Sequence, residues 1–72
     1  MPRKLRELRA DLRRAGFVQT RQKGSHQSWQ HPALGGEVVT LSGSDGKDAK
    51  PYQERDVRRA IELVRAKEGQ LP

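Results

Sequence analysis

The stretch "FVQTRQKGSHQSWQH", residues 17–31, decides the fold and contains both histidines of the chain. Its two halves are rich in residues that favour extended structure, and they flank Lys23 and Gly24 at a natural turn position. This pattern predicts a β-hairpin with strands over residues 17–22 and 25–31. Because Lys-Gly is a poor type I′ pair, a type I turn in which Gly24 forms a G1 bulge fits better.

The register of this hairpin has two solutions at the level of sequence. The bulged turn places Phe17 opposite Trp29 and Thr20 opposite His26. A strict two-residue loop places Arg21 opposite His26 instead. The cross-strand neighbour of His26 therefore stays open between Thr20 and Arg21, whereas the alternation of side chains along the second strand is the same in both cases.

Apolar residues recur at helical spacing on both sides of the hairpin. Before it, they lie at steps of three and four in residues 3–15, and Gly16 follows where a left-handed C-cap is favoured. After it, they recur at i, i+3, i+4 and i+7 in residues 52–67. These stripes predict two amphipathic helices. Their apolar members are Leu5, Leu8, Leu12 and Ala15 in the first helix, and Val57, Ala60, Ile61 and Val64 in the second.

The remaining segments complete an α-β-β-β-α order. "EVVTLS", residues 37–42, predicts a short third strand, and "GSDGKDAKP", residues 43–51, has the composition of a solvated loop. Two amphipathic helices must bury their stripes against one face of the three-stranded antiparallel sheet. This predicts a two-layer α+β fold with the other sheet face open. A chain of 72 residues has room for a single domain, residues 1–72.

The composition also bears on partners and location. The chain has no cysteine, so neither a disulfide nor a thiolate metal site supports its small core. Domains of this size without such support often depend on another chain, and we expect an oligomer or a heteromer. Because no apolar stretch is long enough to cross a membrane and no signal peptide is evident, we expect a cytoplasmic protein without membrane contact.

The net charge of +6 is concentrated in the first half of the chain. Residues 1–31 hold eight Lys and Arg against two acidic residues, whereas residues 32–72 hold seven of each sign. A localised positive field attracts polyanions, of which nucleic acid is the commonest. A solvated helix face would explain the charge equally well, so charge alone leaves both interpretations open.

Alternation along the second strand separates the two histidines. Trp29, the largest apolar side chain, marks the face covered by helices, and His26 then projects from the open face beside the basic turn. His31 shares the side of Trp29, where a histidine usually has a structural role. Imidazole titrates near neutrality, so His26 is able to accept the proton of an RNA 2′-OH or protonate the leaving 5′ oxygen. The alternative, which is equally open, is that His26 is only a polar residue of the surface.

A metal or phosphate-loop site has little support in the sequence. The odd spacing of His26 and His31 sends them to opposite faces of a strand, with no evident third ligand. The segment "GSDGKD", residues 43–48, lacks both the ligand series of an EF-hand and the glycine-lysine signature of a P-loop. We therefore expect no metal and no cofactor.

The stretch "GFVQTRQKGSHQSWQHP", residues 16–32, resembles the signature of HicA-type toxins, which are small mRNA interferases of toxin-antitoxin pairs. The resemblance implies a fold like that of a double-stranded RNA-binding domain, with His26 as catalytic residue and a HicB-type antitoxin as partner. Many members continue after the third strand with a Pro-x-His segment and a "GTL"-like helix entry. This chain has "TLSGSDGKDAKPYQERDV" there, which indicates a variant branch, and residues 43–52 inherit no role.

The leading hypothesis is a ribosome-independent endoribonuclease that cleaves mRNA without metal, with His26 as acid or base. Arg21 and Lys23 would hold phosphate, and Gly24 and Ser25 would complete the RNA-binding turn. The second catalytic group stays open between Lys23, an arginine, water and the geometry of the 2′-OH itself. The alternative is a non-catalytic RNA-binding module that uses the same basic face, and a third hypothesis is a purely structural subunit. Any oligomer would form mainly through the antitoxin.

Overall fold

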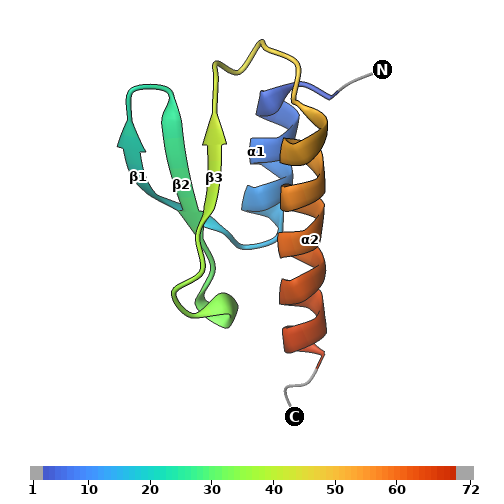
Figure 1. Ribbon diagram of the computed structural model, residues 1–72. Coiled ribbons are helices and arrows are strands. Elements are labelled where there is room, and N and C mark those ends of the chain that lie inside the picture. The colour runs from blue at the N-terminus through green and yellow to red at the C-terminus, as the bar shows by residue number, and fades with distance from the viewer. Residues whose placement is uncertain (1–2, 70–72) are drawn as a thin grey trace.

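The computed structural model describes residues 3–69 and has the predicted α+β architecture. The elements in chain order are α1 (Leu5–Arg14), β1 (Val18–Lys23), β2 (His26–Gln30), the short 3-10 helix η1 (Pro32–Leu34), β3 (Val39–Ser42) and α2 (Pro51–Glu68). The strands form an antiparallel sheet in the order β1-β2-β3. Figure 1 shows the two helices together on one side of this sheet, with β1 farthest from α2. The predicted α-β-β-β-α order is confirmed.

Helix α1 ends where the sequence places a glycine. Gly16 has φ +97°, a left-handed conformation that costs glycine little. A second constraint acts at the same position, because a Cβ there would lie 2.9 Å from Nε2 of His31. Gly16 therefore both terminates the helix and lets the ring of His31 pack against the backbone.

The hairpin turn differs from the prediction. Lys23 pairs directly with His26, so the loop consists of Gly24 and Ser25. Gly24 has φ +60°, and no other residue type has a positive φ in the described chain. This is the pattern of a type II′ turn, which takes glycine at its first central position and matches the twist of the strands. The predicted type I turn with a bulged Gly24 is wrong, because Lys23 belongs to the strand and Ser25 to the loop.

Both predicted registers are wrong, because Gly24 and Ser25 alone form the loop and because β1 contains an irregularity. The pairing shifts between Gln19 and Arg21, which leaves Thr20 as the extra residue of a β-bulge. Gln19, not Phe17, consequently lies opposite Trp29. The neighbour of His26 is Lys23, and neither Thr20 nor Arg21 occupies that place.

The hydrophobic core lies between the sheet and the helices. Trp29 is 1 % exposed, which confirms that its side of β2 is the covered one. The guanidinium of Arg13 on α1 lies 5.2 Å from the centre of its indole ring, a cation–π contact that closes the core on that side. The other buried apolar residues are Leu5, Leu8, Leu12, Phe17, Leu34, Leu41, Ala49, Val57, Ala60 and Val64.

A buried arginine connects α1 to the loop that follows β3. Arg9 is 3 % exposed, donates to the carbonyl of Gly43 at 2.6 Å and forms an ion pair with Asp45. Hydrogen bonds from a charged donor contribute about 1.5–3 kcal/mol each. The first residues of this predicted solvated loop are therefore fixed against α1.

Trp29→Ala is expected to lower the free energy of unfolding by about 3–5 kcal/mol, because removing a buried aromatic side chain leaves a cavity in a small core. The midpoint of chemical denaturation, followed by circular dichroism, measures this change. Val18→Ala is the control, since Val18 is 57 % exposed and should change stability by less than about 0.5 kcal/mol. Equal midpoints for the two variants would contradict the assignment of Trp29 to the core.

Candidate functional site

The open face of the sheet brings His26 into a row with side chains from both neighbouring strands. Lys23 on β1 and Ser42 on β3 are its direct cross-strand partners. His26 and Lys23 are exposed, and Ser42 is half-buried. An imidazole thus lies between an ammonium group and a hydroxyl, all on the side of the sheet away from Trp29.

A second polar row lies next to the first, two residues along β2. Ser28 is paired with Arg21 on β1 and with Thr40 on β3. Two residues along a strand correspond to about 6.7 Å. The open face therefore carries two parallel rows, each with one cation on β1 and one hydroxyl on β3.

The hydrogen-bond pattern brings Ser42 especially near His26. The N–H of Gly43 donates to the carbonyl of Ser25 at 3.3 Å, which makes Ser25 and Gly43 a hydrogen-bonded pair. Because such pairs alternate along antiparallel strands, His26 and Ser42 form a non-hydrogen-bonded pair. The Cα atoms of such a pair lie about 4.5 Å apart, and their side chains are closer than in the other kind of pair.

Sequence reasoning missed Ser42 and Thr40 as members of the site. The signal was present in "VVTLS", where a buried Leu41 places both hydroxyl residues on the opposite side of the strand. Which hydroxyl lies beside His26 depends on the register between β2 and β3. That register is not encoded in any local pattern.

Helix α2 fixes the strand end that carries Ser42. Gln53, which is 3 % exposed, donates its Nε2 to the carbonyl of Ser42 at 3.1 Å. Its Oε1 accepts from the backbone N–H of Lys50 at 2.8 Å, in the first turn of α2. A single buried amide thus joins the beginning of α2 to the end of β3.

His31 has a structural role, as the sequence predicted. Its Nδ1 accepts from the N–H of Ala33 at 2.9 Å, and its Nε2 lies 3.1 Å from the carbonyl of Ala15. A carbonyl is an acceptor, so Nε2 carries the proton and the ring is neutral. The ring also packs edge-on against Phe17, with the ring centres 5.1 Å apart. With both nitrogens bonded on the far side of the strand, His31 has no part in the His26 site.

The positive charges of the first half are not equivalent in the folded chain. Several cations of α1 and its approach are engaged by carboxylates, through the pairs Arg3–Asp11, Arg14–Asp11, Lys4–Asp48 and Arg9–Asp45. Within residues 3–69, neither Arg21 nor Lys23 lies in ion-pair distance of an acidic side chain. The hairpin therefore offers its positive charge to an external anion.

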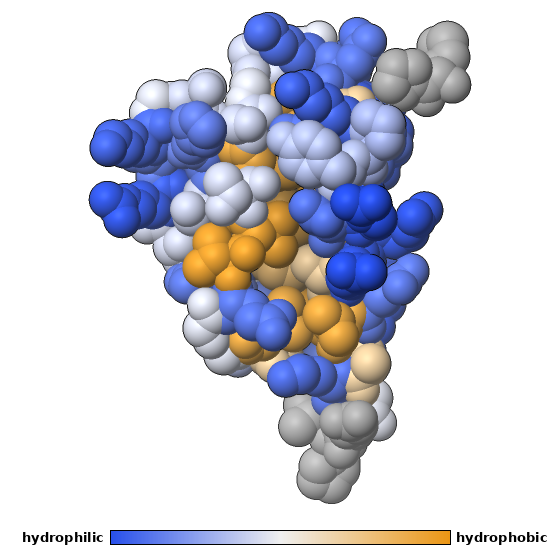
Figure 2. Space-filling model, viewed as in Figure 1, coloured by the Kyte–Doolittle hydropathy of each residue, from blue (hydrophilic) through white to orange (hydrophobic). Residues whose placement is uncertain are grey.

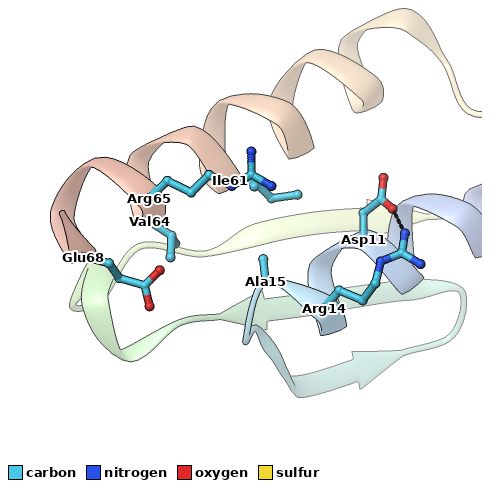
Figure 3. Close-up of a pocket in the computed structure, with 7 residues that line it drawn as sticks. All are labelled: Asp11, Arg14, Ala15, Ile61, Val64, Arg65 and Glu68. Carbon is cyan, nitrogen blue, oxygen red and sulfur yellow. Dashed lines mark hydrogen bonds and ion pairs between the residues drawn. The ribbon is translucent and has the colours of Figure 1, made fainter.

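A cavity of about 570 Å³ lies between α1 and α2, and no residue of the open face lines it (Figure 3). Asp11 lines it and accepts hydrogen bonds from Arg3 and Arg14. The bond from Arg3 in particular holds the pKa of Asp11 below its ordinary value of 3.8. This carboxylate is therefore committed to ion pairs and is a poor general base.

Two kinds of feature are absent from residues 3–69. No group of three or more His, Cys, Asp or Glu side chains is arranged to hold a metal ion in this part of the chain. None of the helices described there is sufficiently long and apolar to cross a bilayer.

Comparison with known families identifies the family of the chain. A family model described as "HicA toxin of bacterial toxin-antitoxin" matches residues 5–63. The chain belongs to the HicA toxin family. A search of curated proteins finds no match. The matched residues include all three strands of this HicA-family toxin and thus both rows of the open face.

Gln53→Glu is expected to loosen the joint between β3 and α2. Glutamate keeps the oxygen that accepts from Lys50, but at neutral pH it has no hydrogen to donate to Ser42, whose carbonyl loses a partner. We expect a loss of about 1–3 kcal/mol in the free energy of unfolding, measured by denaturation, and faster amide exchange in β3. Gln19→Glu, an identical change at an exposed position, should have little effect. Indistinguishable stabilities for the two variants would show that the amide does not hold the strand.

Proposed function

We propose that this HicA-family toxin is a ribosome-independent, metal-independent endoribonuclease that cleaves mRNA through acid–base chemistry at His26. The observation that carries the proposal is the place of His26, exposed on the open sheet face between Lys23 and Ser42. Membership of a toxin family of toxin-antitoxin systems supports it. A HicB-type antitoxin is proposed as the neutralising partner.

In the proposed reaction, RNA supplies its own nucleophile. The 2′-OH loses its proton, the 2′ oxygen forms a bond to the adjacent phosphorus, and the bond from phosphorus to the 5′ oxygen breaks. The leaving 5′ oxygen gains a proton, so the products are a cyclic phosphate and a 5′-OH. His26 acts as the base in the first transfer or as the acid in the last. The complementary role falls to Lys23, an arginine or water.

The groups around His26 suit the charge that develops in this reaction. Arg21 and Lys23 on β1 stabilise the phosphate oxygens, and donors directed at developing charge are among the strongest catalytic contributions. The turn residues Gly24 and Ser25 let the RNA backbone approach without a large side chain in the way. The hydroxyl of Ser42 is able to orient the ribose or the phosphate from the other side.

A second candidate function is RNA binding without cleavage at the same face. The observation that favours it is that the two rows of the open face contain a single imidazole. A binding module would need the cations and hydroxyls and no proton transfer. The two candidates differ in whether His26 contributes to product formation or only to affinity.

His26→Ala is expected to reduce cleavage of a single-stranded RNA by about 10²–10⁴-fold, because a positioned proton-transfer group contributes that much. The rate is measured on a labelled oligonucleotide in EDTA, together with growth arrest on expression. RNA affinity should change little, which separates chemistry from binding. Ser44→Ala, an exposed hydroxyl in the loop after β3, serves as the control. Cleavage that requires added divalent metal, or an unimpaired His26→Ala, would sink the proposed mechanism.

RNA affinity is expected to fall steeply with salt, because cations that neutralise phosphates of a single strand release about 0.7 counterions each. The slope of the logarithm of the binding constant against the logarithm of salt concentration should decrease by about 0.7 in Arg21→Ala and in Lys23→Ala. Arg58→Ala on α2 should leave the slope unchanged, since this exposed arginine lies outside the open face. Equal slopes in all three variants would mean that the hairpin cations do not contact RNA.

A further inference from the structure

The outer edge of β3 has backbone groups without partners. Ser25 and Gly43 form a hydrogen-bonded pair, so the alternation directs the N–H and C=O of Thr40 and Ser42 away from β2. The carbonyl of Ser42 is taken by Gln53. Within residues 3–69, the outward backbone groups of Thr40 have no hydrogen-bond partner. Such an edge is a template for another strand.

An apolar groove of about 210 Å³ lies between this edge and α2. Its apolar lining comes from η1, from β3 with the residue before it, and from α2, and includes Leu34, Val38, Val39, Ala60 and Leu63. Val38 is 49 % exposed and Leu63 is 40 % exposed. Figure 2 shows hydrophobic residues gathered at this place, between β3 and α2. Single exposed apolar residues are ordinary, but a contiguous patch indicates an interaction surface.

The charges at the groove distinguish it from the RNA-binding face. Glu37, Asp56 and Arg59 are its charged members, and Asp56 also lies 3.9 Å from the guanidinium of Arg55. Two acids and one base give no positive surplus, although the chain as a whole carries +6. A phosphate backbone is drawn to the hairpin and not to this groove. An apolar groove beside an unpaired strand edge suits a polypeptide instead.

We propose that the β3 edge and this groove bind an extended segment of the antitoxin as an added β-strand. Strand addition combines main-chain hydrogen bonds with pockets for alternate side chains, and both are present here. The segment should carry apolar residues at alternate positions and a Lys or Arg near Glu37 and Asp56. The proposal rests on the proposed function, because it assigns a site to the same neutralising partner.

An added strand at this edge would extend the sheet and so place side chains beside the open face that carries His26. It would lie about 4.8 Å from β3 and about 10 Å from β2. Its side chains opposite the groove would continue the open face beside Thr40 and Ser42. One segment would thus anchor in the apolar groove and obstruct the rows that bind RNA.

A second copy of the toxin is a less suitable occupant. In a two-fold pair the same patch meets itself, so Glu37, Asp56 and Arg59 of both copies would gather at one interface with a surplus of negative charge. Like charges placed together in this way oppose association. An antitoxin segment has no such restriction.

The test compares two groove variants with a matched control and uses the proposed HicB-type antitoxin as the titrant. Val38→Lys places a charge in the groove, and Thr40→Pro removes an outward N–H, a change that edge strands tolerate. Calorimetric titration should show antitoxin affinity reduced at least about tenfold in each, or about 1.4 kcal/mol. Val18→Lys changes an exposed valine on the other edge strand, β1, and should alter the affinity less than about twofold. Denaturation midpoints verify that all three variants fold.

A cleavage assay separates this proposal from the proposed function. Val38→Lys should cleave RNA at the wild-type rate. It should also stay active at antitoxin concentrations that inhibit the wild type. Wild-type antitoxin affinity in both groove variants would overturn the strand-addition site and leave RNA cleavage untouched. A wild-type dimer that Val38→Lys converts to a monomer, with antitoxin affinity unchanged, would assign the edge to a second copy and also overturn it. Absence of cleavage by the wild type would count against the enzyme, whereas the binding comparison would still decide the site.

Discussion

Burial of Trp29 is the constraint on which the site depends. Side chains alternate along β2, so an indole that is 1 % exposed on one face forces His26 and Ser28 onto the other. A slip of one residue would expose the indole and bury the imidazole. The alternation of side chains along β2 therefore places both the largest side chain of the core and the proposed catalytic group.

The fold also divides its positive charge between two uses. Asp11, Asp45 and Asp48 engage cations of the first helical segment, and the Arg9–Asp45 pair binds the loop after β3 to α1. The hairpin cations Arg21 and Lys23 have no such carboxylate nearby in the described residues. At physiological ionic strength the screening length is about 8 Å, so an anion responds to the nearest cations and not to the net charge. This favours the hairpin as the place where the proposed RNA substrate would bind.

Local patterns were sufficient for the elements and for the sheet faces on which the two histidines lie, since alternation and helical spacing extend over a few residues. They failed at the turn, where Gly24 and Ser25 form the loop, and at the bulge of Thr20, because register is a property of two strands together. Gln53 and Arg9 were equally hidden. Each is a polar residue of an amphipathic helix that bonds to a backbone carbonyl at the end of β3. The bonded carbonyl lies 11 residues away in the sequence for Gln53 and 34 residues away for Arg9.

The third strand links the two proposed binding surfaces. The side chains of Thr40 and Ser42 belong to the open face, whereas the outward backbone of Thr40 belongs to the edge beside the groove. In these proposals, charge would select RNA at the first surface, and apolar contact with main-chain pairing would select the antitoxin at the second. Because salt weakens the first kind of attraction far more than the second, the two ligands respond differently to ionic conditions. An inhibitor anchored at the edge therefore needs no direct bond to His26: its bulk beside β3 is enough to deny RNA the neighbouring rows.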